Sequence, residues 1–342
     1  MASRLVRTGG IVVAVALVLL VGTGIYLKSK VDPWGPAGRE VAVDIPRGTS
    51  TARIAEELAH KGVVTDASIF RLYLKVKGGG PFEAGLYRLR RGSSMGEALA
   101  VLADGPDLPP AVYITVPEGL TLLETAERVS EKAPHLTAEQ FVAVARSGAV
   151  RSRYQAAGSS NLEGFLFPET YRVEEKEDEA GVVRRMVATF DDIAESVGYD
   201  ATQAKVGLTP YETVIVASLI EAEAKSDEDR AKISRVIYNR LAKKMTLGID
   251  ATFYYVLPPE RKGTGLRRSD LARDTPYNTR IHAGLVPTPI MAPSRASLAA
   301  ALNPEPGPWL FYVLKDATTH AFSSDYNQFL RDKNAAAAKG LL

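Results

Sequence analysis

The chain has 342 residues, of which 46% are hydrophobic and 24% are charged, a composition typical of a folded protein with room for two or three domains. Its 42 basic and 40 acidic side chains nearly cancel, and no basic segment with interleaved aromatic residues is present, which argues against nucleic acid as a partner. There is no cysteine, and the four histidines are far apart and outside any His-Glu-x-x-His pattern. We therefore expect a site that works without a metal ion and without another cofactor.

The first notable segment is the uncharged run at residues 8–27. As a helix with a rise of about 1.5 Å per residue it is long enough to cross a hydrocarbon layer of about 30 Å. Basic residues flank it on both sides, so charge does not set its orientation. A cleaved signal peptide is the alternative, but no small-x-small cleavage site follows at once. We predict a short tail at 1–7, a single transmembrane anchor at 8–27 and a linker at 28–40.

Two similar segments follow the linker. Residues 41–62 and 112–133 each show the pattern of a strand, a Pro-x-Gly turn and an amphipathic helix, and Pro46 and Gly48 align with Pro117 and Gly119. We interpret them as two copies of a small strand-helix-helix-strand module, at 41–107 and 108–180. Between them, Ser94 lies in a Gly-x-Ser-x-Gly pattern found in serine hydrolases, but with Glu97 it also forms a helix capping box, which we favour.

The remainder, residues 181–342, has mainly helical periodicity. Proline-rich and aromatic loops at 246–255, 274–280 and 284–294 are expected to wall a groove. Residues 309–314 and 320–324 read as a strand pair, and a last amphipathic helix starts at Asp325. The sequence thus predicts an α+β protein whose final domain is mainly helical with a small β element.

Glu223 is the strongest candidate for a chemical role. If residues 211–225 form a helix, Glu223 lies on the same apolar face as Leu219 and Ile220, whereas Glu221 lies on the other side, where an i,i+4 pair with Lys225 indicates a solvated face. A carboxyl group among aliphatic side chains has a raised pKa and can donate a proton near neutral pH. The alternative is a residue at the helix edge that reaches water or pairs with an arginine.

A set of ordered motifs resembles the MltG family of endolytic murein transglycosylases. They are ASLIEAEA, DEDRAKISRVIYNRL, DATFYYVL, YNT, GLVPTPIMAPS, AALNP, LFYV and HAFS, together with the N-terminal anchor and the paired modules, the first of which is similar to a LysM domain. The resemblance covers nearly the whole chain. It implies cleavage of peptidoglycan glycan strands outside the cytoplasmic membrane of a bacterium, with peptidoglycan synthases or division proteins as further partners.

The resemblance assigns the catalytic acid to Glu223. It implies that this residue protonates the oxygen between N-acetylmuramic acid and N-acetylglucosamine, then accepts the proton of the muramyl C6 hydroxyl as a 1,6-anhydro end forms. Asp250 is the candidate second acid, for positioning substrate or holding its loop. Further residues that can hydrogen-bond sugar or acetamido groups are Asn239, Tyr277, Asn278 and Thr279. An internal bond that fixes the helix against the loop is the alternative for Asn239.

The sequence departs from the family pattern at four positions, where Ala224 replaces a hydroxyl residue, Gly248 a glutamine, Ala251 a proline and Tyr326 a histidine. These departures bear on substrate contacts and leave the acid in place. Two other functions remain open. One is a non-catalytic glycan-binding scaffold for cell division, and the other is a muramidase, which would hydrolyse the strand with the help of a second carboxylate.

Overall fold

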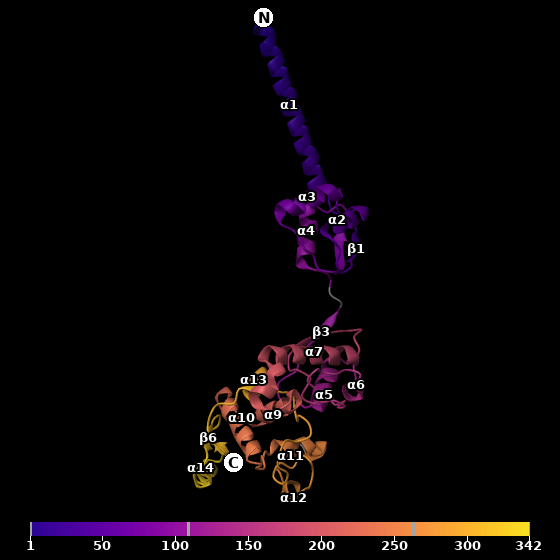
Figure 1. Cartoon of the computed structure of the whole chain (residues 1–342). Coiled ribbons are helices and arrows are strands. Elements are labelled where there is room, and N and C mark those ends of the chain that lie inside the picture. The colour runs from indigo at the N-terminus through magenta and orange to yellow at the C-terminus, as the bar shows by residue number, and fades with distance from the viewer. Residues whose placement is uncertain (1, 108–109, 262–263, 342) are drawn as a thin grey trace. The chain divides into compact units, whose positions relative to one another are not determined.

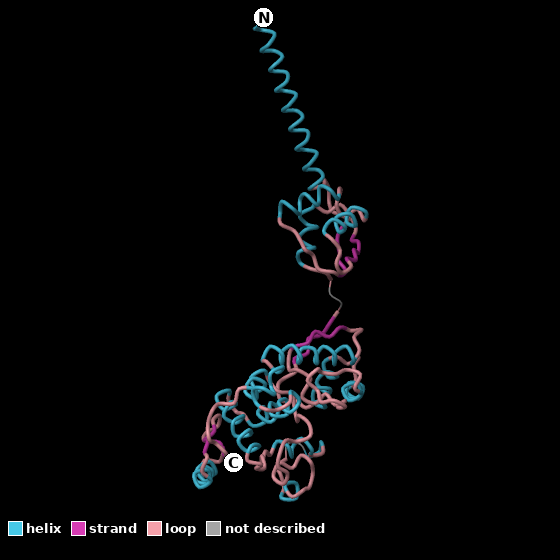
Figure 2. The backbone as a smooth tube through the Cα atoms, viewed as in Figure 1, coloured by secondary structure: helices cyan, strands magenta, loops and turns pink. Residues whose placement is uncertain are grey.

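A computed structural model describes residues 2–107, 110–261 and 264–341, with the side chains of residues 2–16 and 259 outside the description. The chain divides into two compact units, Met1–Pro110 and Ala111–Leu342. Both mix helices with a few short strands, and helices predominate (Figures 1 and 2). The predicted α+β class is confirmed.

The N-terminal segment is helical from Ala2 to Val31 (α1). Among the residues whose side chains are described, no helix has the length and apolar character needed to span a membrane. The predicted anchor at 8–27 falls partly on residues 8–16, whose side chains lie outside the description. The anchor therefore stays a prediction.

The first unit is built around one antiparallel strand pair. β1 (Glu40–Ile45) pairs with β2 (Gly85–Arg90), with Ile45 opposite Gly85, and α2 (Thr51–His60) and α3 (Ala67–Lys77) connect them, before α4 (Met95–Asp104). The hydroxyl of Ser94 accepts a hydrogen bond from the backbone of Glu97 and the Glu97 carboxylate accepts one from Ser94, so this serine caps α4. The capping interpretation of the Gly-x-Ser-x-Gly pattern is confirmed.

The second unit begins with the same order of elements. β3 (Ala111–Thr115) pairs antiparallel with β4 (Thr170–Glu174), and α5 (Leu122–Lys132) and α6 (Ala138–Ser147) lie between them. Both predicted modules therefore have the strand-helix-helix-strand order. The similarity of the first to a LysM domain stays a prediction.

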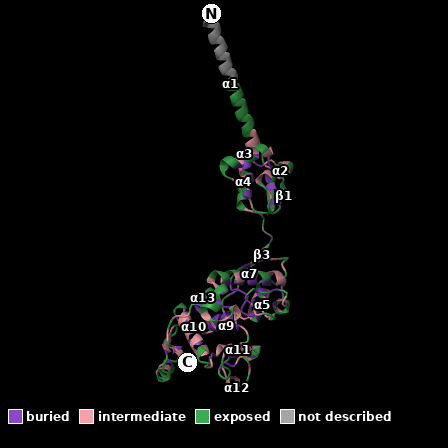
Figure 3. Ribbon diagram, in the orientation of Figure 1, coloured by how far each residue is buried: buried purple, intermediate pink, exposed green. Residues whose placement is uncertain are grey.

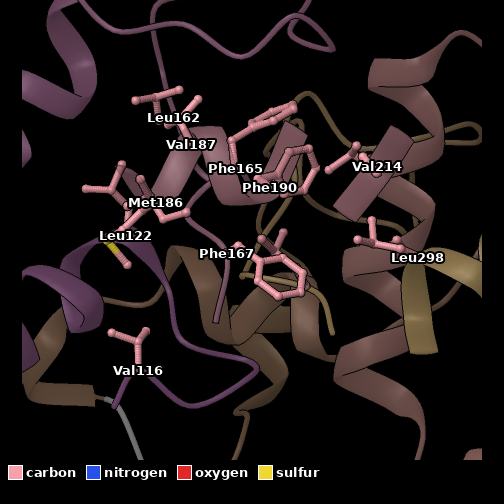
Figure 4. Packing of buried hydrophobic residues seen from close by; sticks show 14 of the residues in the cluster. Val116, Leu122, Leu162, Phe165, Phe167, Met186, Val187, Phe190, Val214 and Leu298 are labelled. Carbon is pink, nitrogen blue, oxygen red and sulfur yellow. The ribbon is translucent and has the colours of Figure 1, made fainter. Parts of the chain in front are cut away.

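The second module shares its hydrophobic core with the helices that follow it. These are α7 (Glu179–Val197), α8 (Thr202–Val206), α9 (Pro210–Glu223), α10 (Asp227–Ala242), α11 (Ala251–Val256), α12 (Arg268–Leu271) and α13 (Arg295–Leu302). Figure 4 shows Leu122 and Phe165 of the module in the same cluster as Phe190 of α7, Val214 of α9 and Leu298 of α13. The rings of Phe165 and Phe190 meet edge to face, with centroids 5.0 Å apart. The predicted boundary near residue 180 thus lies within one continuous core.

The chain ends in a strand pair and a helix. β5 (Phe311–Leu314) pairs antiparallel with β6 (His320–Ser323), and α14 (Tyr326–Ala338) starts after its cap residue Asp325. The predicted strand pair and the predicted last helix are confirmed. β5 and β6 contribute side chains to the candidate site.

Candidate active site

Glu223 is the last residue of α9. The helix starts with Pro210 after Thr209, whose side chain forms a capping box with Glu212, and it packs against α10, α11 and α13. Every residue from 213 to 220 is buried (Figure 3). The expected single apolar face is therefore wrong, because α9 is a central helix enclosed on all sides. Glu223, at the C-terminal end of α9, lies where this helix leaves the hydrophobic core.

Glu221 has a structural role that the sequence pattern did not reveal. Its Oε2 accepts hydrogen bonds from the backbone N–H of Ser294 (2.9 Å) and the Ser294 hydroxyl (2.5 Å), and lies 3.1 Å from Nη1 of Arg230. The Glu221 side chain is only 9% exposed. The prediction of a solvated pair with Lys225 is wrong, because α10 and the loop before α13 cover this side of α9. Glu221 holds these elements together.

Glu223 differs from Glu221 because it borders a cavity. Its side chain is partly exposed, and its Oε2 accepts a hydrogen bond of 2.8 Å from the Tyr312 hydroxyl. Burial raises the pKa of Glu223; the Tyr312 bond offsets this in part, while the charge of Asp250 raises the pKa further. The position at the helix C-terminus also disfavours a negative charge. The carboxyl group therefore keeps its proton to a higher pH than an ordinary glutamate, as a proton donor requires.

The cavity around Glu223 has a volume of about 360 Å³. Its lining includes Arg240 from α10, Gly248 and Asp250 from the following loop, and Tyr312 from β5. Arg240 donates hydrogen bonds to the carbonyl oxygens of Leu310 (2.6 Å) and Leu247 (2.7 Å), so it joins the strand pair to the loop. Burial lowers the pKa of Arg240, but an arginine remains charged at neutral pH.

Tyr312 is a site residue that the sequence reasoning missed. Its ring meets the ring of His320 at 89°, with centroids 5.5 Å apart. His320 in turn is held to α10, since its backbone N–H donates to Oδ2 of Asp229 and its Nδ1 lies 2.8 Å from the same oxygen. The only sequence signal was the LFYV and HAFS motifs, which do not show that the two strands reach the end of α9.

Asp250 is the one predicted substrate residue that lines the cavity with Glu223. Its Oδ1 accepts hydrogen bonds from Nε (3.1 Å) and Nη2 (2.5 Å) of Arg280, and both side chains are about half exposed. The loop is shaped by Gly248, which has φ +62°, a conformation that favours glycine. Glycine therefore suits this position on the cavity wall.

The other predicted substrate residues have internal partners. The amide of Asn239 donates to the carbonyl oxygens of Gly307 (3.0 Å) and Trp309 (2.8 Å), which is the alternative role considered for it. The Tyr277 hydroxyl lies 2.8 Å from that of Thr288. Neither side chain lines the cavity around Glu223.

Asn278 and Thr279 are buried beneath the same loop. The Asn278 amide donates to the carbonyl oxygens of Leu271 and Arg273, and the Thr279 hydroxyl exchanges hydrogen bonds with the backbone of Ile249. With their polar groups used internally, they support the loop that carries Asp250. Their expected contact with a sugar stays a prediction.

The other departures from the family pattern lie around the same site. Ala224 caps the C-terminus of α9, Ala251 begins α11, and Tyr326 is 55% exposed with its ring against Phe311. Within the described residues, no cluster of three or more histidine and acidic side chains could hold a metal ion.

Comparisons with known proteins place these observations in context. The model of the YceG-like family matches residues 43–335 of this chain. A protein of Bacillus subtilis (strain 168) named endolytic murein transglycosylase is 30% identical over 332 residues, which is 93% of this chain and 90% of that protein. A protein of the same name from Streptococcus pneumoniae (strain R6) is 30% identical over 321 residues, and the chain spans 58% of its length. A crystal structure of a YceG-like protein from Listeria monocytogenes is 28% identical, with a TM-score of 0.56, and the match covers 85% of this chain and 98% of that one.

Proposed function

Because the chain belongs to the YceG-like (MltG) family, we propose that it is an endolytic murein transglycosylase that cleaves the β-1,4 bond between N-acetylmuramic acid and N-acetylglucosamine. The observation that carries this proposal is the carboxyl group of Glu223, half-buried in a cavity and hydrogen-bonded by Tyr312. We further propose that residues 8–27 anchor the enzyme in the cytoplasmic membrane, with the catalytic unit outside. There it would act on nascent strands and end or trim their elongation, near peptidoglycan synthases or division proteins.

The geometry supports separate roles for the two carboxyl oxygens of Glu223. Since Tyr312 donates to Oε2, the proton of the acid form is carried by Oε1. Oε1 would protonate the glycosidic oxygen as the bond from that oxygen to C1 of the muramyl residue breaks. The resulting carboxylate would then take the proton of the muramyl C6 hydroxyl as the C6 oxygen bonds to C1. The proton leaves and returns, and no water is consumed.

A muramidase remains the second candidate. Hydrolysis normally needs a second carboxylate as a nucleophile or as a base for water. Asp250 is the acid that borders the cavity with Glu223, but Arg280 holds its Oδ1 in two hydrogen bonds. This pairing suits a role in positioning the substrate or the loop better than a role in activating water.

The test is digestion of uncrosslinked glycan strands by the purified protein, followed by mass spectrometry of the products. Anhydro-muramyl ends support the proposal, reducing ends indicate a muramidase, and uncut strands indicate a binding scaffold. Glu223→Gln should abolish cleavage, whereas Glu228→Gln, an exposed acid on α10, should cleave at the normal rate. Because burial raises the pKa of Glu223, the rate should fall on the alkaline side only above the usual range of a glutamate.

A further inference from the structure

A second cavity lies beside the one that contains Glu223. It has a volume of about 490 Å³, within the range of roughly 300–1,000 Å³ that is usual for ligand sites. One wall is the turn between β3 and α5, with Gly119 and Thr121, and the other is α11, with Tyr254 and Tyr255. We call it the α11 cleft. It belongs entirely to the second unit.

The α11 cleft adjoins the cavity that contains Glu223. Ala222, the residue before Glu223, lines both cavities. Asp250 lines the cavity of Glu223, and the next residue, Ala251, lines the α11 cleft. A chain-like ligand bound across the end of α9 would therefore meet Glu223 in one pocket and continue into the α11 cleft.

The walls of the α11 cleft are tied together by a buried carboxyl group. Glu163 is only 3% exposed; its Oε1 accepts a hydrogen bond of 2.9 Å from the backbone N–H of Leu122, and its Oε2 accepts one of 3.1 Å from the Tyr255 hydroxyl. Leu122 follows the wall residue Thr121 directly, and Tyr255 lies in the opposite wall. Glu163 thus fixes the distance between the walls.

The loop before α13 closes the cleft further along. The backbone N–H of Gly119 donates to Ala292 (2.9 Å), and the backbone N–H of Ala292 donates to Leu120 (2.8 Å). This pairing holds Met291 in the lining beside the β3–α5 turn. Hydrogen bonds therefore join the three segments that surround the α11 cleft, which are the β3–α5 turn, α11 and the loop before α13.

The chemistry of the lining suits a sugar ring. Tyr254 is 40% exposed, although its neighbour Phe253 is 3% exposed and part of the core. An exposed aromatic face packs against the C–H groups of a pyranose, and nearby polar groups can bond its hydroxyls. Met291 adds an apolar surface, and the carboxylate of Glu124, which accepts hydrogen bonds from Thr121, adds acceptor oxygens.

We propose that the α11 cleft binds sugar units of the same glycan strand on one side of the cleaved bond, with Tyr254 as the stacking surface. This inference rests on the proposed function and deepens it, because it states how the enzyme selects an internal bond. A strand that fills both the cavity of Glu223 and the α11 cleft places an internal linkage at the acid. A short oligomer that fills only the cavity of Glu223 lacks the contacts with Tyr254.

The test compares glycan oligomers of increasing defined length as substrates for the wild type and for Tyr254→Ala. We expect Tyr254→Ala to raise KM for long oligomers by roughly tenfold, because one aromatic contact with the substrate is lost, and to leave kcat unchanged. KM for the shortest oligomer that is cleaved should not change. Tyr113→Ala, an equal truncation of a tyrosine that is 68% exposed on β3, is the matched control and should behave as wild type. An equal change for short and long oligomers, or no change for either, would overturn the inference.

Binding to uncleaved strands separates this inference from the proposed function. In a Glu223→Gln background, the Kd for a long oligomer should rise roughly tenfold when Tyr254→Ala is added. If the wild type cleaves strands but Tyr254→Ala weakens neither binding nor cleavage, the cleft assignment is wrong and the function stands. If binding depends on Tyr254 but the wild type leaves strands uncut, the proposed activity is wrong and the cleft assignment stands.

Discussion

The buried carboxyl group of Glu163 predicts an unusual dependence of stability on pH. Burial raises its pKa from 4.5 to about 7, even though Leu122 and Tyr255 donate hydrogen bonds to it. Between about pH 4.5 and pH 7 the Glu163 carboxyl group is therefore protonated in the folded state but ionised in the unfolded state. At about 1.4 kcal/mol per tenfold change in proton affinity, this difference is worth about 3 kcal/mol. The stabilisation is complete below about pH 4.5 and is lost as the pH rises through about 7.

The perturbation is Glu163→Gln, which keeps an oxygen for Leu122 and an amide group for Tyr255 but does not titrate. Between pH 5 and pH 8 the wild type should lose about 2.5 kcal/mol of the stability of the second unit through this group, on top of changes common to both proteins. The free energy of unfolding of Glu163→Gln should show only the changes common to both proteins, so the stability of the variant relative to the wild type should increase as the pH rises.

The assay is urea unfolding at a series of pH values, followed by tryptophan fluorescence. The chain has two tryptophans, Trp34 in the first unit and Trp309 in the second. Because Trp34 is 82% exposed, Trp34→Phe leaves Trp309 as the single reporter with little structural cost. The reasoning about Glu163 would be refuted by free energies of unfolding for wild type and Glu163→Gln that run parallel from pH 5 to pH 8.

Two further predictions concern the acid and the packing behind the α11 cleft. Tyr312→Phe should lower kcat about tenfold or more, because the hydrogen bond to Glu223 is lost. It should also move the alkaline limb of the pH–rate profile to higher pH, since that bond lowers the pKa of Glu223. A lower rate with an unmoved limb would indicate a purely structural role for Tyr312. Gly164→Ala should lower the Tm of the second unit more than Gly158→Ala. Both glycines have φ near +80°, but a β-carbon at Gly164 would lie 2.4 Å from Cβ of Pro289, whereas Gly158 faces open space. Equal decreases in Tm would show that the backbone conformation alone sets the cost.

Much of the local structure could be read from the chain. Caps such as Ser94 and Asp325 mark where helices begin because their side chains satisfy backbone N–H groups within three residues. The repeated pattern of a strand, a Pro-x-Gly turn and a helix predicted two modules of the same order. These features depend on contacts between near neighbours in the sequence.

The candidate site was only partly predictable. Glu223 was selected from its motif and its aliphatic neighbours, and the structure places it beside a cavity. The expected faces of α9 were wrong, however, because a helix enclosed by others has no solvated face on which Glu221 could pair with Lys225. Tyr312 was missed for a related reason, since 89 residues separate it from the carboxyl group to which it donates.

The sequence by itself determined the order of helices and strands, the family of the chain and the candidate acid, because caps, apolar periodicity and motif spacing act over a few residues. Only the tertiary structure decided which polar groups are used internally, as for Asn278 and Thr279, and which face a cavity, as for Asp250 and Tyr254. The physical reason is that burial and hydrogen bonding depend on segments far apart in the chain. A carboxyl group such as Glu163 shows a perturbed pKa only when α5 and α11 close around it.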